Sequence, residues 1–288
     1  ILASKNSDVS SIVLEKYVLN YLIKHNTEFP EEVLALLREG IAGYQVFESV
    51  IDLAIVVEEE YLVDYSELIL QGLQIHPRVW RLDRLVQFSL RLLNKNLNAK
   101  AKEILLEIFA VFPNEENYIL GLIGRCSEWE YSSSFKYLTS SADSNNCIEL
   151  LDIARQLLIN ASNVFESSEE SSDSLSRIAL SSIYLRRAIE ASEQNQYCDE
   201  IFGALVDSVR DLALLSDSSN SKIVRDLMNE ALNEDNLTMK RIAINHFRIV
   251  KAPKETLIKL LLNTKFKLDL NLHHEYWLLF HEAGYLLN

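Results

Sequence analysis

The chain has 288 residues, of which only 7 are Gly and 4 are Pro, and it carries a formal net charge of −14 at pH 7. Typical proteins contain about 7% Gly and about 5% Pro, so the shortage of both favours helices joined by short polar turns. Hydrophobic residues make up 48% of the chain and charged residues 24%, which excludes disorder over most of its length. No apolar run reaches the ~18 residues of a membrane-spanning helix, so we expect no membrane span.

Helices are predicted almost from end to end, because apolar residues recur at helical spacing between recognisable capping residues. Asp8 is placed to cap the first helix, and Pro30 and Gly40 bracket the second at the ends where helices favour them. The further helices are predicted at residues 42–60, 64–76, 78–95, 98–112, 115–127, 131–141, 146–166, 174–195, 198–215, 220–234, 237–251, 254–264 and 272–287.

One internal repeat is visible in the N-terminal half. Residues 66–77, SELILQGLQIHP, align with residues 102–113, KEILLEIFAVFP, and the aligned positions share their Pro and most of their apolar character. We expect each segment to be the second helix of a helix–turn–helix unit, which the proline ends. A period of 20–50 residues in helical sequence is typical of an α-solenoid.

Between residues 60 and 125, large side chains, small side chains and a helix-ending proline recur at the spacing of a known helical repeat. These residues are Leu85, Phe88, Ser89, Leu92, Ala101, Leu105, Ile108 and Pro113. The pattern resembles tetratricopeptide-type repeats, and from residue 198 onward the helices 220–234 and 237–251 look more like HEAT or armadillo repeats. These resemblances imply an all-α fold, a right-handed α-solenoid of about 14 to 15 antiparallel helices with no β-sheet.

The expected organisation is one continuous solenoid with three parts. Residues 1–165 would form tetratricopeptide-like repeats, residues 166–173 an acidic Ser-rich loop, and residues 174–288 HEAT-like repeats. Each helix pair has an apolar face that it can bury only against its neighbours, and the stack then offers a long surface of the kind that binds extended peptides or other proteins.

Motifs of catalysis are not found in the sequence. The chain contains no phosphate-binding glycine loop and no nucleophile elbow. His274 and His281 lie about 10 Å apart along a helix axis, too far to share one zinc ion, and the three cysteines form no C-x-x-C pair. We therefore expect no catalytic site, no metal and no cofactor, and we predict that the chain is not an enzyme.

Charge is unevenly distributed along the chain. Residues 240–267 contain eight basic side chains and one acid, a local charge of +7. On a helical projection Lys240, Arg241, Arg248 and Lys251 share one arc with Ile244, which we expect to be exposed among them. Such a face would suit an acidic peptide with one hydrophobic anchor, although a solvated face that complements the acidic remainder is the alternative. The predicted partner-binding residues are Lys240, Arg241, Ile244, Arg248, Lys251, Lys254 and Lys259.

A second charged feature is the run SSEESSDS at residues 167–174. Serines followed by acids resemble the sites of acidophilic kinases, and each phosphate would add about 1.5 to 2 negative charges. The candidate phosphorylation sites are Ser167, Ser168, Ser171 and Ser172. A solvated linker between two helical halves is the alternative.

These features together predict a non-catalytic scaffold for protein–protein interaction, a helical-repeat subunit of a larger intracellular complex in the nucleus or cytoplasm. Its partners would be other protein subunits or an acidic, extended peptide. A solenoid that binds nucleic acid or chromatin through the C-terminal basic face is the alternative, although the net charge of −14 opposes broad contact with phosphate backbones. A helical enzyme subunit completed by a partner is a third alternative.

Overall fold

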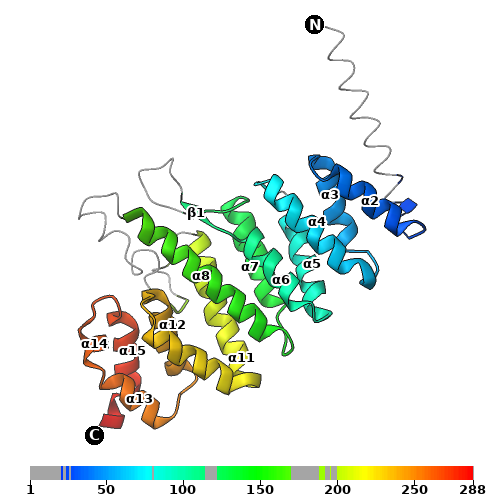
Figure 1. The fold of residues 1–288 in the computed structure, drawn as a ribbon. Helices are drawn as coiled ribbons and strands as arrows, with labels where there is room; N and C mark the ends of the chain where they lie inside the picture. Colours follow the sequence, from blue (N-terminus) through cyan, green and yellow to red (C-terminus); the bar gives the residue numbers. More distant parts are fainter. Residues whose placement is uncertain are drawn as a thin grey trace. The chain divides into compact units, whose positions relative to one another are not determined.

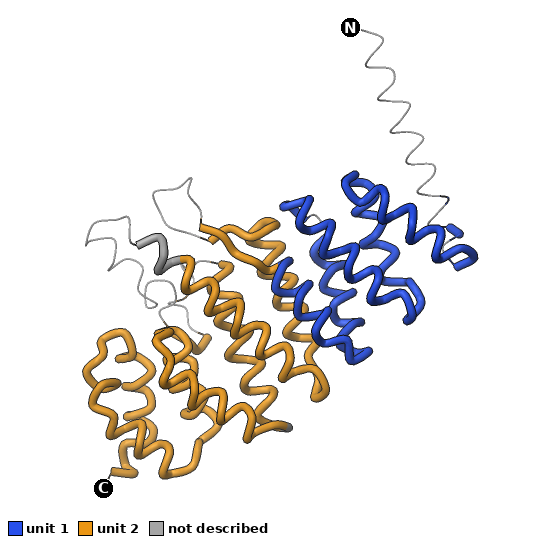
Figure 2. The backbone as a smooth tube through the Cα atoms, viewed as in Figure 1, with its two compact units in different colours: residues 1–108 blue, residues 109–288 orange. Residues whose placement is uncertain are grey.

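The computed structural model describes residues 21, 24–25, 27–79, 81–113, 122–169, 188–191, 195 and 200–287. Most of the described residues are α-helical (Figure 1), which confirms the predicted all-α class. The chain divides into two compact units, Ile1–Ile108 and Phe109–Asn288, which Figure 2 distinguishes by colour.

Unit 1 is built from helical hairpins. Within it, α3 packs against α4 and α5, and α6 packs against α4 and α5. The first helices of two successive hairpins are therefore in contact, and so are the second helices. The described helices of unit 1 are α2 (Pro30–Gly40), α3 (Tyr44–Ala54), the 3₁₀ helix η1 (Glu59–Tyr61), α4 (Leu62–Ile75), α5 (Leu82–Asn94) and α6 (Asn98–Ile108).

The internal repeat of the sequence corresponds to equivalent helices of these hairpins. Its two copies fall on α4 and α6, which contact one another. The matched residues Leu68 and Ile104 are buried, as are Ile69 and Leu105. The repeat therefore records the apolar face that each second helix buries between the hairpins.

The two hairpins are also joined by one side chain. Arg91 of α5 donates hydrogen bonds from Nη1 to the carbonyl oxygens of Ala54 and Ile55, at 3.1 and 3.0 Å, and from Nη2 to that of Val57. These carbonyls lie at the end of α3, where backbone acceptors lack partners within the helix and where a positive charge is favoured. The guanidinium of one hairpin thus satisfies the helix end of the other.

Unit 2 is organised around α11, which packs against α7, α8 and α12. In the C-terminal part of unit 2, α15 packs against α12, α13 and α14. The described elements of unit 2 are β1 (Phe112–Pro113), β2 (Leu122–Ile123), α7 (Glu128–Ser140), α8 (Cys147–Glu169), α11 (Glu200–Asn233), α12 (Leu237–Ile249), α13 (Lys254–Leu261), α14 (Thr264–Leu268), α15 (His273–Ala283) and the 3₁₀ helix η3 (Gly284–Leu287).

The expected absence of a β-sheet is wrong. β1 and β2 form a small antiparallel sheet in which Phe112 pairs with Ile123 and Pro113 with Leu122, so no helix covers the end of the predicted range 115–127. Proline cannot continue the preceding helix, and glycines 121 and 124 on either side of β2 lower its helix propensity. Gly124 also lies under a ring, because a Cβ atom there would come within 2.9 Å of Tyr131 Cδ2.

The helices expected at 198–215 and 220–234 correspond to the two parts of α11, which is kinked at Asn220, a non-helical residue at φ −135° and ψ 39°. The polar run SDSSNS around it offers side-chain hydrogen bonds that compete with helical ones. The helix expected at 174–195 is wrong at residues 188–191, which are non-helical; residues 170–187 lie outside the described part. The first positions of the predicted loop 166–173 belong to α8.

Close packing of α3 on α4 requires glycine at one position. A Cβ atom on Gly72 would lie 2.2 Å from Cδ2 of the buried Phe47 ring. We expect Gly72→Ala to lower the free energy of unfolding by about 1–3 kcal/mol, since the ring must move in a filled core. Urea denaturation monitored by circular dichroism measures this change. Gly284→Ala is the control, because its Cβ would meet the Phe280 ring at an ordinary 3.7 Å; equal effects of the two substitutions would contradict the packing argument.

Candidate interaction site in unit 2

The predicted basic face of α12 is only partly a surface. Arg241 and Ile244 are both fully buried, so the expectation that they are exposed is wrong. Arg241 forms a two-pronged ion pair with Glu275 of α15, with Nε 3.0 Å from Oε2 and Nη2 2.9 Å from Oε1. The helical projection placed Arg241 and Arg248 on one arc of α12, and both contact acids of α15 instead of solvent. Lys251 of the same predicted arc follows the end of α12 with φ of 50° and is exposed.

Residues 188–191 complete this buried cluster. Glu275 Oε1 also accepts a hydrogen bond from the backbone N–H of Ile189 at 3.2 Å, and the Ile189 carbonyl accepts one from Nη1 of Arg210 at 2.8 Å. The Ile189 side chain is fully buried. We call Arg210, Arg241, Arg248 and Glu275 the arginine clasp.

Arg248 holds the next residue of the same segment. Its Nη2 lies 2.9 Å from Oε2 of Glu190, and its Nη1 lies 2.6 Å from Oε1 of Glu282. The face predicted to take an acidic peptide with one hydrophobic anchor therefore holds an apolar residue and an acid of the chain itself, Ile189 and Glu190. Sequence reasoning missed this occupant because it assigned residues 188–191 to a helix.

The other predicted lysines are accessible. Lys240 is half-exposed, and Lys251, Lys254 and Lys259 are exposed. None of these ammonium groups forms an ion pair with a residue in the described ranges. Their partner-binding role stays a prediction.

Exposed leucines lie among further lysines at α13 and α14. Leu262, Leu268 and Leu270 are 64, 78 and 80% exposed. Asn263 caps α14 by accepting from the N–H groups of Lys265 and Phe266, and the buried Phe266 turns inward, so the leucines on either side of this short helix remain outside. We call this the lysine–leucine surface; it consists of Lys254, Lys259, Leu262, Lys265, Lys267, Leu268 and Leu270.

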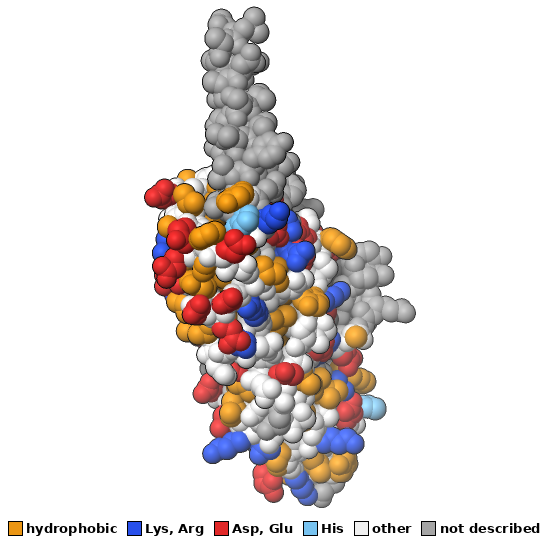
Figure 3. Space-filling view, turned by 90° about the vertical axis from the view of Figure 1, so that its right-hand side faces the viewer, with side chains coloured by type: hydrophobic (Ala, Val, Ile, Leu, Met, Phe, Trp, Pro, Cys, Tyr) orange, Lys and Arg blue, Asp and Glu red, His pale blue; other side chains and the backbone are white. Residues whose placement is uncertain are grey.

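A hollow of about 650 Å³ adjoins this surface. Lys240 and Lys265 line it together with Leu262 and Phe266, and Asp235 and Asp269 add negative charge. The structure thus brings the predicted Lys240 close to a part of the lysine–leucine surface that the prediction did not include. In the face drawn in Figure 3, hydrophobic, basic and acidic side chains lie next to one another near the lower end of the view.

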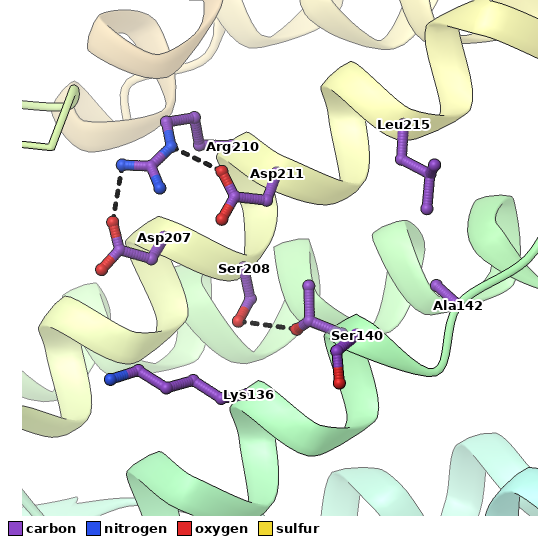
Figure 4. Close-up of a pocket in the computed structure, with 9 residues that line it drawn as sticks. Lys136, Ser140, Ala142, Asp207, Ser208, Arg210, Asp211 and Leu215 are labelled. Carbon is purple, nitrogen blue, oxygen red and sulfur yellow. Dashed lines mark hydrogen bonds and ion pairs between the residues drawn. The ribbon is translucent and has the colours of Figure 1, made fainter.

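A second hollow of about 600 Å³ lies between α7 and α11 (Figure 4). Arg210 there donates to Asp207 and Asp211, each at 2.7 Å, and Thr139 Oγ1 donates to Ser208 Oγ at 2.9 Å. Burial alone would lower the pKa of Arg210, but its hydrogen bonds and ion pairs with the two aspartates raise it. Arg210 is thus paired with two acids, and neither His nor Cys lines the hollow.

The remaining candidate groups gather into no metal site. Among the described residues, no three His, Cys, Asp or Glu side chains are placed to hold a metal ion. His281 stacks on Trp277, with ring centroids 5.3 Å apart. Cys147 is buried, and burial, aided by the charge of Glu130, raises the pKa of Cys126 to about 12, which keeps this thiol protonated near neutral pH.

The phosphorylation candidates are divided by the end of α8. Ser167 and Ser168 belong to this helix, which ends at Glu169, whereas Ser171 and Ser172 lie outside the described residues. No helix in the described part of the chain is both long and apolar enough to span a membrane.

His246 of α12 is a buried histidine that the prediction did not single out. Its Nε2 lies 3.7 Å from Oδ1 of Asp217 on α11. Burial lowers the pKa of His246 below its ordinary value, and the charge and hydrogen bond of Asp217 offset part of this shift. The neutral imidazole is therefore favoured in the folded chain.

Comparison with known proteins adds no relative: no protein-family model, curated protein or solved structure matches the chain.

The first prediction from this site concerns the arginine clasp. Glu275→Leu and Arg241→Met should each lower the free energy of unfolding by about 3–5 kcal/mol, because each removes one half of a buried ion pair. The double variant should lose much less than the sum. It should still lose about 1–3 kcal/mol, since the N–H of Ile189 no longer has its acceptor. Urea denaturation of the unmodified chain, the two single variants and the double variant measures the coupling, and losses that simply add would contradict it.

The second prediction concerns pH. Because the folded state lowers the pKa of His246, the unfolded chain takes up its proton first as the pH falls below about 6.5, and this protonation stabilises the unfolded state relative to the folded one. We expect stability to decrease from pH 7 towards pH 5.5, and His246→Gln to decrease less over the same range. Denaturation midpoints at several pH values measure the difference; identical slopes would contradict it.

Proposed function

We propose that the chain is a non-catalytic scaffold for protein–protein interaction, a helical-repeat subunit of a larger intracellular complex in the nucleus or cytoplasm. The observation that carries this proposal is the lysine–leucine surface. Three leucines are left mostly exposed beside lysines that have no carboxylate partner among the described residues. Exposed apolar groups that gather in one place mark interaction sites.

The helical arrangement supports a repeat architecture. In unit 1, successive hairpins contact one another first helix to first helix and second helix to second helix, as in repeats that stack. We propose that this arrangement is part of a right-handed α-solenoid, tetratricopeptide-like in the N-terminal half and HEAT-like in the C-terminal half.

The chemistry of the surface defines its partner. We propose an acidic segment of another protein that places one or two apolar side chains against Leu262, Leu268 and Leu270. Burying a leucine contributes about 1.5–3 kcal/mol, whereas exposed lysines mainly speed association and select acidic partners. The hollow beside Lys240 and Lys265 would receive one anchoring side chain of that segment.

Nucleic acid is the second candidate partner. Lys251, Lys254 and Lys259 are exposed and without ion-pair partners in the described residues, as contacts with phosphate would require. The exposed leucines favour protein over nucleic acid, because most contacts with nucleic acid are made by polar groups to phosphate and sugar.

A charge-reversed, less apolar variant tests the proposal. The triple variant Lys265→Glu, Lys267→Glu, Leu268→Ser should reduce capture of the partner proteins at least tenfold, because it removes both charge complementarity and an apolar contact. Tagged chains are expressed in the cells of origin, co-purifying proteins are quantified by mass spectrometry, and each partner is then purified and titrated directly.

The control is matched in chemistry and lies in the same unit. Lys136→Glu, Lys222→Glu, Leu215→Ser changes the same residue types at exposed positions away from this surface, and it should bind like the unmodified chain. Equal capture by both triple variants would place the interaction elsewhere. Retention of RNA or DNA duplexes that is lost in the first variant alone would instead support the nucleic-acid alternative.

A further inference from the structure

A small pocket lies where α12 ends against the second half of α11. It has a volume of about 300 Å³, which is at the lower end of the range for small-ligand sites. The residues that line it with charged or titratable side chains are Asp217, Arg225, His246 and Lys251. None of the proposed contacts of the lysine–leucine surface lines this pocket.

The two cations of the pocket are available to a ligand. Arg225 and Lys251 are exposed, and neither forms an ion pair with any residue in the described part of the chain. An Arg guanidinium offers a planar fork of donors that matches phosphate oxygens, and a Lys ammonium adds a point charge. Against these two positive charges the lining holds one carboxylate, Asp217.

Lys251 occupies its position at a conformational cost. The N–H of Lys251 donates to the carbonyl of Arg248 at 3.2 Å, and the N–H of Ala252 donates to that of Phe247 at 3.0 Å. This is the Schellman arrangement, whose left-handed residue is usually Gly, yet Lys251 has φ of 50°. The other left-handed residue outside glycine in the described chain is Asn96, a type that tolerates this conformation.

His246 adds a polar group to the wall of the pocket. His246 is 3% exposed, and its Nδ1 atom has no hydrogen-bond partner among the described residues. Its Nε2 lies 3.7 Å from Oδ1 of Asp217, which also lines the pocket. A bound anion would favour protonation of His246, which would then donate to Asp217.

We propose that this pocket binds a phosphate group, which Arg225 holds through its guanidinium fork and Lys251 holds through its ammonium group. The group could be carried by a small phosphorylated compound or by a phosphorylated side chain of a partner. The pocket gives a phosphate two charge-assisted contacts and a net positive lining, and it lies at a helix end whose backbone places the Lys251 side chain against it.

The test uses the full chain and inorganic phosphate as the probe, with chloride at equal ionic strength as the reference. Phosphate should bind saturably and shift the imidazole NMR signals of His246. Arg225→Gln and Lys251→Gly should each weaken binding about tenfold, as expected for the loss of one charge-assisted contact. Gly suits the left-handed backbone at position 251, so the second variant is expected to fold. Lys222 is an exposed cation of α11, the helix that carries Arg225, and it does not line the pocket. The variant Lys222→Gln should therefore bind phosphate within twofold of the unmodified chain.

A phosphoserine peptide and its unphosphorylated form separate the two sources. Binding of free phosphate that depends on Arg225 and Lys251 supports a small phosphorylated ligand. Binding of the phosphopeptide alone, with the same dependence, supports a phosphorylated partner. The absence of saturable binding by either probe, or equal binding by the Arg225→Gln and Lys222→Gln variants, overturns the proposal. The triple variant of the lysine–leucine surface should still bind phosphate, so failure of the proposed function and failure of this inference are distinguishable.

Discussion

The ion pair between Arg241 and Glu275 determines how the C-terminal part of unit 2 is assembled. Both side chains are buried, so each needs the other, because an isolated charge in the interior costs several kcal/mol. Their pairing fixes α15 against α12, and the hydrogen bond from the Ile189 N–H to Oε1 of Glu275 fixes the backbone of Ile189 beside this pair. A pair of this kind adds little net stability over apolar packing, but it accepts few alternative arrangements. It therefore specifies which helices meet.

The accessible part of unit 2 has the opposite character. Where the interior pairs every arginine of the clasp with an acceptor, the lysines of α13 and α14 face solvent without partners in the described chain, and leucines lie between them. The contrast follows residue chemistry: the arginine fork suits buried, fixed pairs, whereas the lysine ammonium is strongly hydrated and flexible. The predominantly basic segment 240–267 is thus divided into a structural part and an accessible part.

Sequence patterns were sufficient for the fold class and for the helix repeat, because both depend on local spacing. The scarcity of Gly and Pro, and the match between residues 66–77 and 102–113, correspond to real helices and equivalent positions. The burial of Arg241 depends instead on Glu275, which lies 34 residues away in the sequence, and on residues 188–191, which the local pattern assigned to a helix. One signal was present: Glu275 interrupts the apolar stripe of Leu272 and Leu279, and an acid there requires a cationic partner. A helical projection supplies angles around an axis, but it does not say which arc another helix covers.

The contact of Arg91 with the end of α3 has a consequence for how disturbance travels through unit 1. The acceptors belong to one hairpin and the donor to the next, so the last turn of α3 depends on where α5 lies as well as on its own hydrogen bonds. Loosening of α5 would leave three carbonyl groups without their donor and would encourage α3 to unravel from its end. The two neighbouring hairpins should therefore open together, which broadens the cooperative unit beyond a single pair of helices.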